Sequence, residues 1–104
     1  MQLNRDEFAK VLGTSFVLNA GDDRTLDMKL TEVTPVRDRP HQVSFSILFK
    51  LPADEWVEQG LYYLKHKSFG EFQLFLVPIG QDPDGIVLEA VINRLKDGES
   101  EISG

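Results

Sequence analysis

Residues 71–95 restrict the fold more than any other part of the sequence. Two apolar runs in this stretch are joined by Asp-Pro-Asp-Gly at 82–85, in which Asp opens a type I turn, Pro fixes φ, and Gly closes the turn with a positive φ. Both runs alternate with a period of two, which predicts a β-hairpin. The first run, 72–79, is apolar on both faces for much of its length. A strand of this kind has to be covered on both sides, so we expect it to be the central strand of the fold.

Earlier segments of the chain show strand-like alternation as well. The phase slips between Leu30 and Val33, which predicts a bulge or bend of the kind that barrel corners require. Six short strands joined by tight turns favour a mainly β fold, either a small antiparallel six-stranded barrel or a rolled sheet. The four strands expected before the hairpin are 14–19, 24–36, 42–50 and 61–66, with a charged loop at 37–40.

A short helix is predicted at the N-terminus. Asn4 is a suitable N-cap, Glu7 stands at the capping-box position, and Gly13 is placed to end the helix. A two-turn helix is marginal alone in water, so we expect it to dock as a lid over one open end of the sheet. Helix and strands together make one domain over 1–95, and residues 96–104, which lack periodicity, are expected to form a flexible C-terminal tail.

The charge of the chain restricts its partners. Seventeen acidic and eleven basic residues give a formal net charge of −6. Nucleic acids and anionic membranes would be repelled, because their binding relies on Lys and Arg, and the run Lys65-His66-Lys67 is too short to reverse this. No signal segment is recognisable at the start, and no apolar run approaches the roughly 18 residues that span a bilayer. We therefore expect a cytoplasmic protein that binds neither nucleic acid nor membrane.

Few residues point to catalysis or metal binding. The absence of cysteine excludes thiol nucleophiles, and no nucleotide-binding loop or hydrolase elbow occurs. His41 and His66 stand in different segments and are interpreted as partly exposed side chains without a metal. The turn 82–85 has too few ligands and the wrong flanking elements for a calcium loop. We expect no metal, no cofactor and no enzyme activity.

Apolar residues at outward positions form the candidate interaction surface. Trp56, in an acidic loop, is either a plug of the barrel mouth or an exposed anchor. Three apolar or aromatic residues are predicted to face outward: Leu48, Tyr62 and Leu64. The second apolar face of strand 72–79 is predicted to face outward as well. Either the helix or a partner covers this surface, so we expect a protein partner or self-association.

The last third of the chain resembles an uncharacterised family of small bacterial β-rich proteins. The resemblance rests on Leu-Val-Pro-Ile-Gly at 76–80, Asp-x-Asp-Gly at 82–85 and Glu-Ala-Val-x-Asn at 89–93, although Leu88 stands where the family pattern has an aromatic. It implies a domain of unknown function, in a group with phage-tail-collar-like relatives. The resemblance carries no catalytic residue.

Three functions are therefore open at this stage. The first is a non-catalytic protein-interaction or assembly module, an accessory to a phage-tail-like or surface structure. The alternative is a small-ligand-binding β-barrel with a pocket near Trp56, although six short strands leave little interior space. The third is a hydrolase-type enzyme that uses the loop carboxylates Asp54, Glu55 and Glu58.

Overall fold

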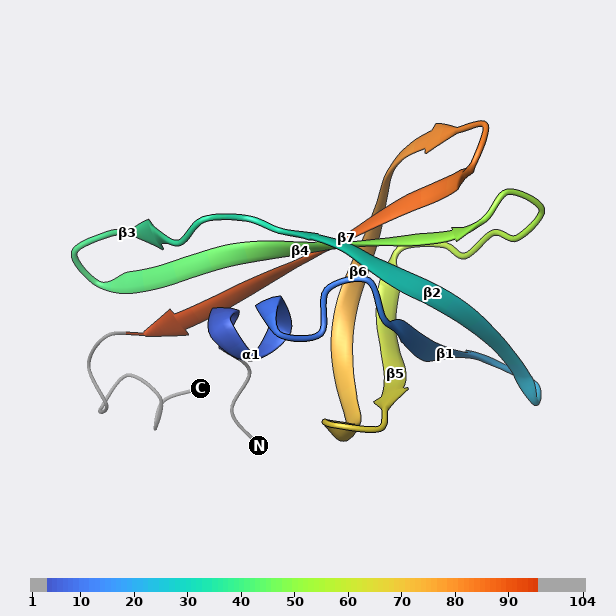
Figure 1. Cartoon of the computed structure of the whole chain (residues 1–104), viewed down its shortest axis with the longest axis horizontal. Helices are drawn as coiled ribbons and strands as arrows, with labels where there is room; N and C mark the ends of the chain where they lie inside the picture. The colour runs from blue at the N-terminus through green and yellow to red at the C-terminus, as the bar shows by residue number, and fades with distance from the viewer. Residues whose placement is uncertain (1–3, 96–104) are drawn as a thin grey trace.

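The computed structural model, which describes residues 4–95, is a closed antiparallel β-barrel with one short helix (Figure 1). The sheet order is β2-β1-β5-β6-β7-β4-β3, and an additional β2–β4 pairing closes the first six strands into a ring. The predicted fold class, a mainly β six-stranded antiparallel barrel with an N-terminal helix, is confirmed. The elements are α1 (Arg5–Ala9), β1 (Ser15–Gly21), β2 (Arg24–Val33), β3 (Arg37–Asp38), β4 (Gln42–Pro52), β5 (Gly60–His66), β6 (Gly70–Asp82) and β7 (Gly85–Leu95).

One predicted segment differs in detail from the structure, and another is not tested by it. The charged loop 37–40 contains β3, a two-residue strand that pairs with β4 outside the ring. The predicted tail, 96–104, lies outside the described residues.

Strand β2 forms one corner of the barrel. It pairs with β1 up to Lys29 and with β4 from Lys29 onward, and its register with β4 shifts between Leu30 and Glu32. The bulge predicted at this point is confirmed. Thr31, the extra residue, donates a hydrogen bond from its hydroxyl to the Leu48 carbonyl at 3.2 Å. The bulge bends the strand so that it can serve two neighbours, which closes the ring.

Strand β6, predicted to be central, also divides its pairing between two neighbours. It pairs with β5 as far as Leu76 and with β7 from Val77. The prediction that both of its faces are covered is wrong, because Phe75 and Ile79 are each 52% exposed. A barrel wall has one inner side, and within residues 4–95 no second layer lies over the outer side of β6.

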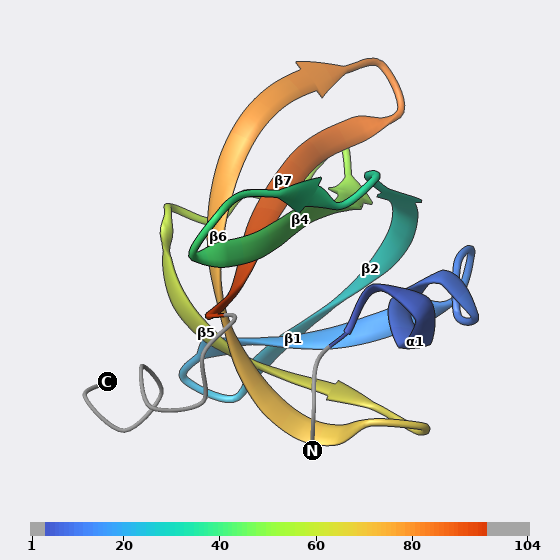
Figure 2. The ribbon, with the colours of Figure 1, turned by 90° about the vertical axis from the view of Figure 1, so that its left-hand side faces the viewer.

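The barrel interior is filled by apolar side chains from every strand of the ring. Phe45, Ile47, Leu74 and Leu88 are buried in this core, whereas Phe72 is half-buried against it. Figure 2 shows β4 and β7 above β1 and β5. No buried side-chain nitrogen or oxygen among the described residues lacks a hydrogen-bond partner.

The helix closes one end of the barrel through a single side chain. Asn4 caps it, accepting the Glu7 N–H at 2.9 Å, and α1 then covers only one turn. Phe8 is fully buried, and its ring centroid lies 5.1 to 6.5 Å from the ring centroids of four other phenylalanines. These rings come from β1, β4, the β5–β6 turn and β6: Phe16, Phe45, Phe69 and Phe72. The predicted lid is therefore present, although it is shorter than expected.

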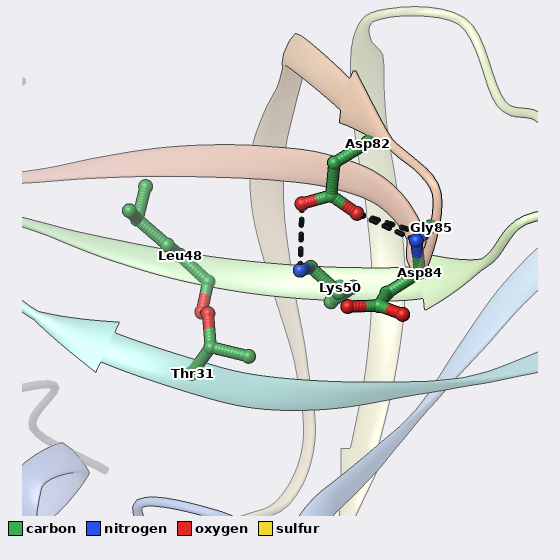
Figure 3. Close-up of polar contacts among 6 residues, drawn as sticks. All are labelled: Thr31, Leu48, Lys50, Asp82, Asp84 and Gly85. Carbon is green, nitrogen blue, oxygen red and sulfur yellow. Dashed lines mark hydrogen bonds and ion pairs between the residues drawn. The ribbon is translucent and has the colours of Figure 1, made fainter.

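The β6–β7 turn is held by an aspartate and requires a glycine. Asp82 Oδ1 accepts the N–H groups of Asp84 and Gly85, at 2.9 and 3.0 Å (Figure 3). Gly85 has the positive φ that was predicted, 158°. A Cβ at this position would lie 1.9 Å from the carbonyl oxygen of Leu51 on β4, so no side chain fits there.

We predict that Gly85→Ala lowers the free energy of unfolding by about 3 kcal/mol, because the methyl group forces β7 away from β4. Urea unfolding measures this loss. Gly70→Ala is the matched control: Gly70 also has a positive φ, 72°, but a Cβ there meets nothing within 4 Å. It should cost only about 1 kcal/mol of backbone strain. Equal losses in the two variants would contradict the close contact at Gly85.

Truncating the lid should also destabilise the barrel strongly. We predict that Phe8→Ala lowers the free energy of unfolding by about 3–5 kcal/mol, since it removes a buried ring and leaves a cavity against four aromatic neighbours. Leu12→Ala, next to the helix but 47% exposed, is the control and should change stability by less than about 1 kcal/mol. A loss below 1 kcal/mol for Phe8→Ala would show that the helix is dispensable.

Candidate functional site

The outer surface of strands β4 to β7 carries a continuous set of apolar side chains. Four of them are more than half exposed: Leu61 at 60%, Tyr63 at 61%, Phe75 at 52% and Val91 at 56%. Contiguous exposed apolar patches of more than a few hundred Å² are uncommon on monomers and mark interaction sites. We call this set the outer apolar face and define it by Leu48, Leu61, Tyr63, Phe75, Val77, Val87 and Val91.

Strand pairing brings these side chains together from distant parts of the chain. Leu61 on β5 lies directly opposite Phe75 on β6, and Tyr63 follows two residues along the same side of β5. Farther across the face, Leu48 on β4 and Val77 on β6 both pair with Glu89, which lies on β7 between them. The face therefore spans four neighbouring strands.

The structure corrects part of the predicted surface. Leu64 is buried in the core and Tyr62 is half-buried against it, so the prediction that both face outward is wrong. All four residues at 61–64 are apolar or aromatic, so the sequence gives no alternation from which to choose the side. Leu48 does face outward and is half-buried in the outer apolar face, while Leu61 and Tyr63 take the places assigned to their neighbours.

Trp56 is an exposed side chain rather than a plug. It is 54% exposed, whereas the next residue, Val57, is buried in the core. The surrounding loop is anchored at both ends. Arg24 on β2 binds Glu55 at 2.8 Å, and the Tyr62 hydroxyl donates to the carbonyl oxygen of Glu58.

A half-open hollow of about 310 Å³ lies on the outer surface of β1 and β5, next to the outer apolar face. Tyr63 lines it and belongs to both features. Its lining is Val17, Asn19, Thr25, Tyr63, Leu64, Lys65 and Glu71, and Trp56 is not among these residues. The pocket expected near Trp56 thus differs in place from this hollow.

The candidate acidic groups are dispersed or already paired. Of the three loop carboxylates, Glu55 binds Arg24, and Asp54 and Glu58 are exposed. Asp82 accepts a hydrogen bond from Lys50 at 2.9 Å, which lowers the pKa of Asp82 and raises the pKa of Lys50 (Figure 3). Within residues 4–95, no three His, Asp or Glu side chains gather as metal ligands.

His66 is buried, so the prediction that it is partly exposed is wrong. Its Nδ1 accepts the Ser68 N–H at 3.0 Å, which leaves the ring proton on Nε2 to donate to Thr14 Oγ1, also at 3.0 Å. The ring stacks on Phe16 with centroids 4.3 Å apart. Burial, and after it the charge of Lys67, lowers the pKa of His66 below its usual value of about 6.5. His66 is thus a structural link between the α1–β1 segment and the β5–β6 turn.

This link predicts a pH dependence of stability. Because the pKa of His66 is lowered by folding, its contribution is complete above about pH 6.5 and is lost as the pH falls toward the folded-state pKa. In urea unfolding between pH 8 and 5, the wild type should lose stability relative to His66→Gln as the pH falls. His41→Gln, at an exposed position, should follow the wild type. Parallel curves for the wild type and His66→Gln would contradict the assignment.

No helix within residues 4–95 is long and apolar enough to cross a membrane.

The chain matches one known protein family: residues 3–92 match the family model described as "Domain of unknown function (DUF6916)". No curated protein and no solved structure matches the chain. The match begins just before α1 and extends into β7, so it covers nearly the whole barrel. The resemblance to an uncharacterised family is confirmed, and the chain belongs to the DUF6916 family of domains of unknown function.

Proposed function

We propose that this domain is a non-catalytic protein-interaction or assembly module that holds a protein partner on its outer apolar face. The observation that carries the proposal is the exposure of Leu61, Tyr63 and Phe75 on neighbouring strands. Removing apolar surface from water favours association by roughly 25 cal/mol per Å², before the costs of binding are subtracted. Aromatic side chains such as Tyr63 and Phe75 are enriched at such contacts.

The filled interior favours an external binding surface over a ligand site inside the barrel. Within residues 4–95, eighteen apolar residues are buried in one continuous cluster. A six-stranded barrel of this kind has its centre occupied by its own side chains. A small ligand would therefore have to bind in a surface hollow, and the one lined by Tyr63 adjoins the proposed protein-binding face. The arrangement of Asp54, Glu55 and Glu58 gives a hydrolase no further support, since Glu55 is bound to Arg24.

Charge favours a partner different from this chain. Two copies, each with a net charge of −6, repel one another, and salt screens that repulsion most strongly at distances beyond about 10 Å. A partner with an apolar surface and a positive balance meets no such opposition. We therefore assign the face to a heterologous protein, encountered in the cytoplasm. The resemblance noted in the last third of the sequence supports a role as an accessory to a phage-tail-like or surface structure.

The proposal is tested by photocrosslinking in the native cell. Phe75 is replaced by p-benzoylphenylalanine, which keeps an aromatic ring on the face, and the control carries the same group at Asp27, an exposed position on β2. We expect one discrete crosslinked protein from position 75 and none from position 27. Adding Leu61→Ser, opposite Phe75, should reduce that crosslink by about tenfold or more, the loss expected from a central apolar contact.

Two outcomes would contradict the proposal. Crosslinks of equal yield from positions 75 and 27, or a yield unaffected by Leu61→Ser, would show that the face makes no specific contact. A crosslinked dimer of this chain, together with self-association in sedimentation that strengthens with salt, would show that the occupant is a second copy.

A further inference from the structure

The outer apolar face contains one charged group near its middle. Glu89 on β7 pairs across to Leu48 on one side and to Val77 on the other. Its neighbours on the same side of its own strand are Val87 and Val91. Glu89 is half-buried, and apolar side chains occupy the four adjacent positions on the same side of the sheet. Residues in such positions are ordinarily apolar, because burying an unpaired charge is costly.

Glu89 has no ion pair or side-chain hydrogen bond within residues 4–95. The cation placed to supply one is Lys50, which is two residues from Leu48 on β4 and faces outward opposite Val87. Its ammonium group, however, binds Asp82 at 2.9 Å, at the β6–β7 turn (Figure 3). The Asp82 side chain also caps that turn, so Lys50 is held away from Glu89.

An unpaired carboxylate surrounded by apolar side chains fits a cation on another molecule better than a second copy of this chain. When a partner covers the face, Glu89 loses water and requires a positive charge to replace it. A copy stacked face to face would instead bring a second Glu89 close to the first, and both copies are acidic.

We propose that Glu89 is the specificity residue of the outer apolar face: it pairs with a Lys or Arg side chain that the partner presents within an apolar surface. The same carboxylate prevents the face from closing on a second copy. This inference rests on the proposed function, since it names the chemistry of the partner at that site.

The first test uses n-butylguanidinium, which imitates an arginine side chain with an apolar stem, as a probe of the ¹⁵N-labelled protein by NMR. We expect saturable shifts of the amides from 87 to 91, and about fivefold weaker binding to Glu89→Gln, the size of a half-exposed ion pair. Asp27→Asn, which makes the same chemical change on β2, should bind as the wild type does. The uncharged analogue n-butanol should not distinguish Glu89→Gln from the wild type.

The second test measures self-association by sedimentation velocity over a range of concentrations. Glu89→Leu completes the apolar face and should form dimers or larger species, whereas the wild type and Asp27→Leu, which removes the same charge elsewhere, should not. A monomeric Glu89→Leu would overturn the role of Glu89 in preventing self-association. Equal probe affinity in the wild type and Glu89→Gln would overturn its role in binding a cation.

The outcomes separate this inference from the proposed function. If the crosslink from position 75 forms at unchanged yield when Glu89→Gln is added, the face binds a partner but the proposed ion pair is wrong. If no crosslink forms from position 75 in the otherwise wild-type chain, the proposed function itself fails, whatever the probe shows. The amide spectrum of Glu89→Gln checks that this variant is folded. Because Gln has nearly the same shape as Glu, the spectrum should be largely unchanged.

Discussion

The fold depends on the burial of Phe8 at the end of the barrel. Six short strands form a ring, but a ring has open ends, and the rings of Phe16, Phe45, Phe69 and Phe72 converge at one of them. A one-turn helix has almost no stability of its own in water. It is kept in place because its single buried side chain completes this aromatic cluster, and because Gly13 and Thr14, just after it, bond to Leu30 of β2.

Filling the interior has a consequence for function. Since the core residues and the lid together occupy the inside of the barrel, the proposed partner-binding surface lies on the outside of the wall. Strand β6 is apolar on both sides because one side builds the core and the other belongs to the outer apolar face. The same doubled pattern would arise in a strand buried between two layers, which is why the pattern alone favoured a central strand.

Ion pairing determines which charges remain available on this surface. Lys50 binds Asp82 and Arg24 binds Glu55, so both surface cations are paired with acidic residues near the connections at one end of the barrel. Pairs of this kind contribute little to stability when exposed. Here they determine which charged groups remain unpaired: because Lys50 binds Asp82, Glu89 has no cation partner on the neighbouring strand β4.

The sequence by itself determined the features that depend on a few adjacent residues. The Asn4 cap, the Asp82 turn with its obligatory Gly85, the bulge at Thr31 and the period of two in β4 all follow from local chemistry. Only the tertiary structure decided the orientation of side chains where the local sequence pattern does not distinguish the two sides of a strand or loop. Residues 61–64 are apolar or aromatic throughout, so the pairing of β5 with β1 and β6, and not the pattern, turned Leu64 inward and Tyr63 outward. Either Trp56 or Val57 could have packed against the core, and Val57, the smaller side chain, is the buried one. The sequence shows Glu89 between Val87 and Val91, but the pairing of β7 with β4 and β6 was needed to place Leu48 and Val77 on either side of it.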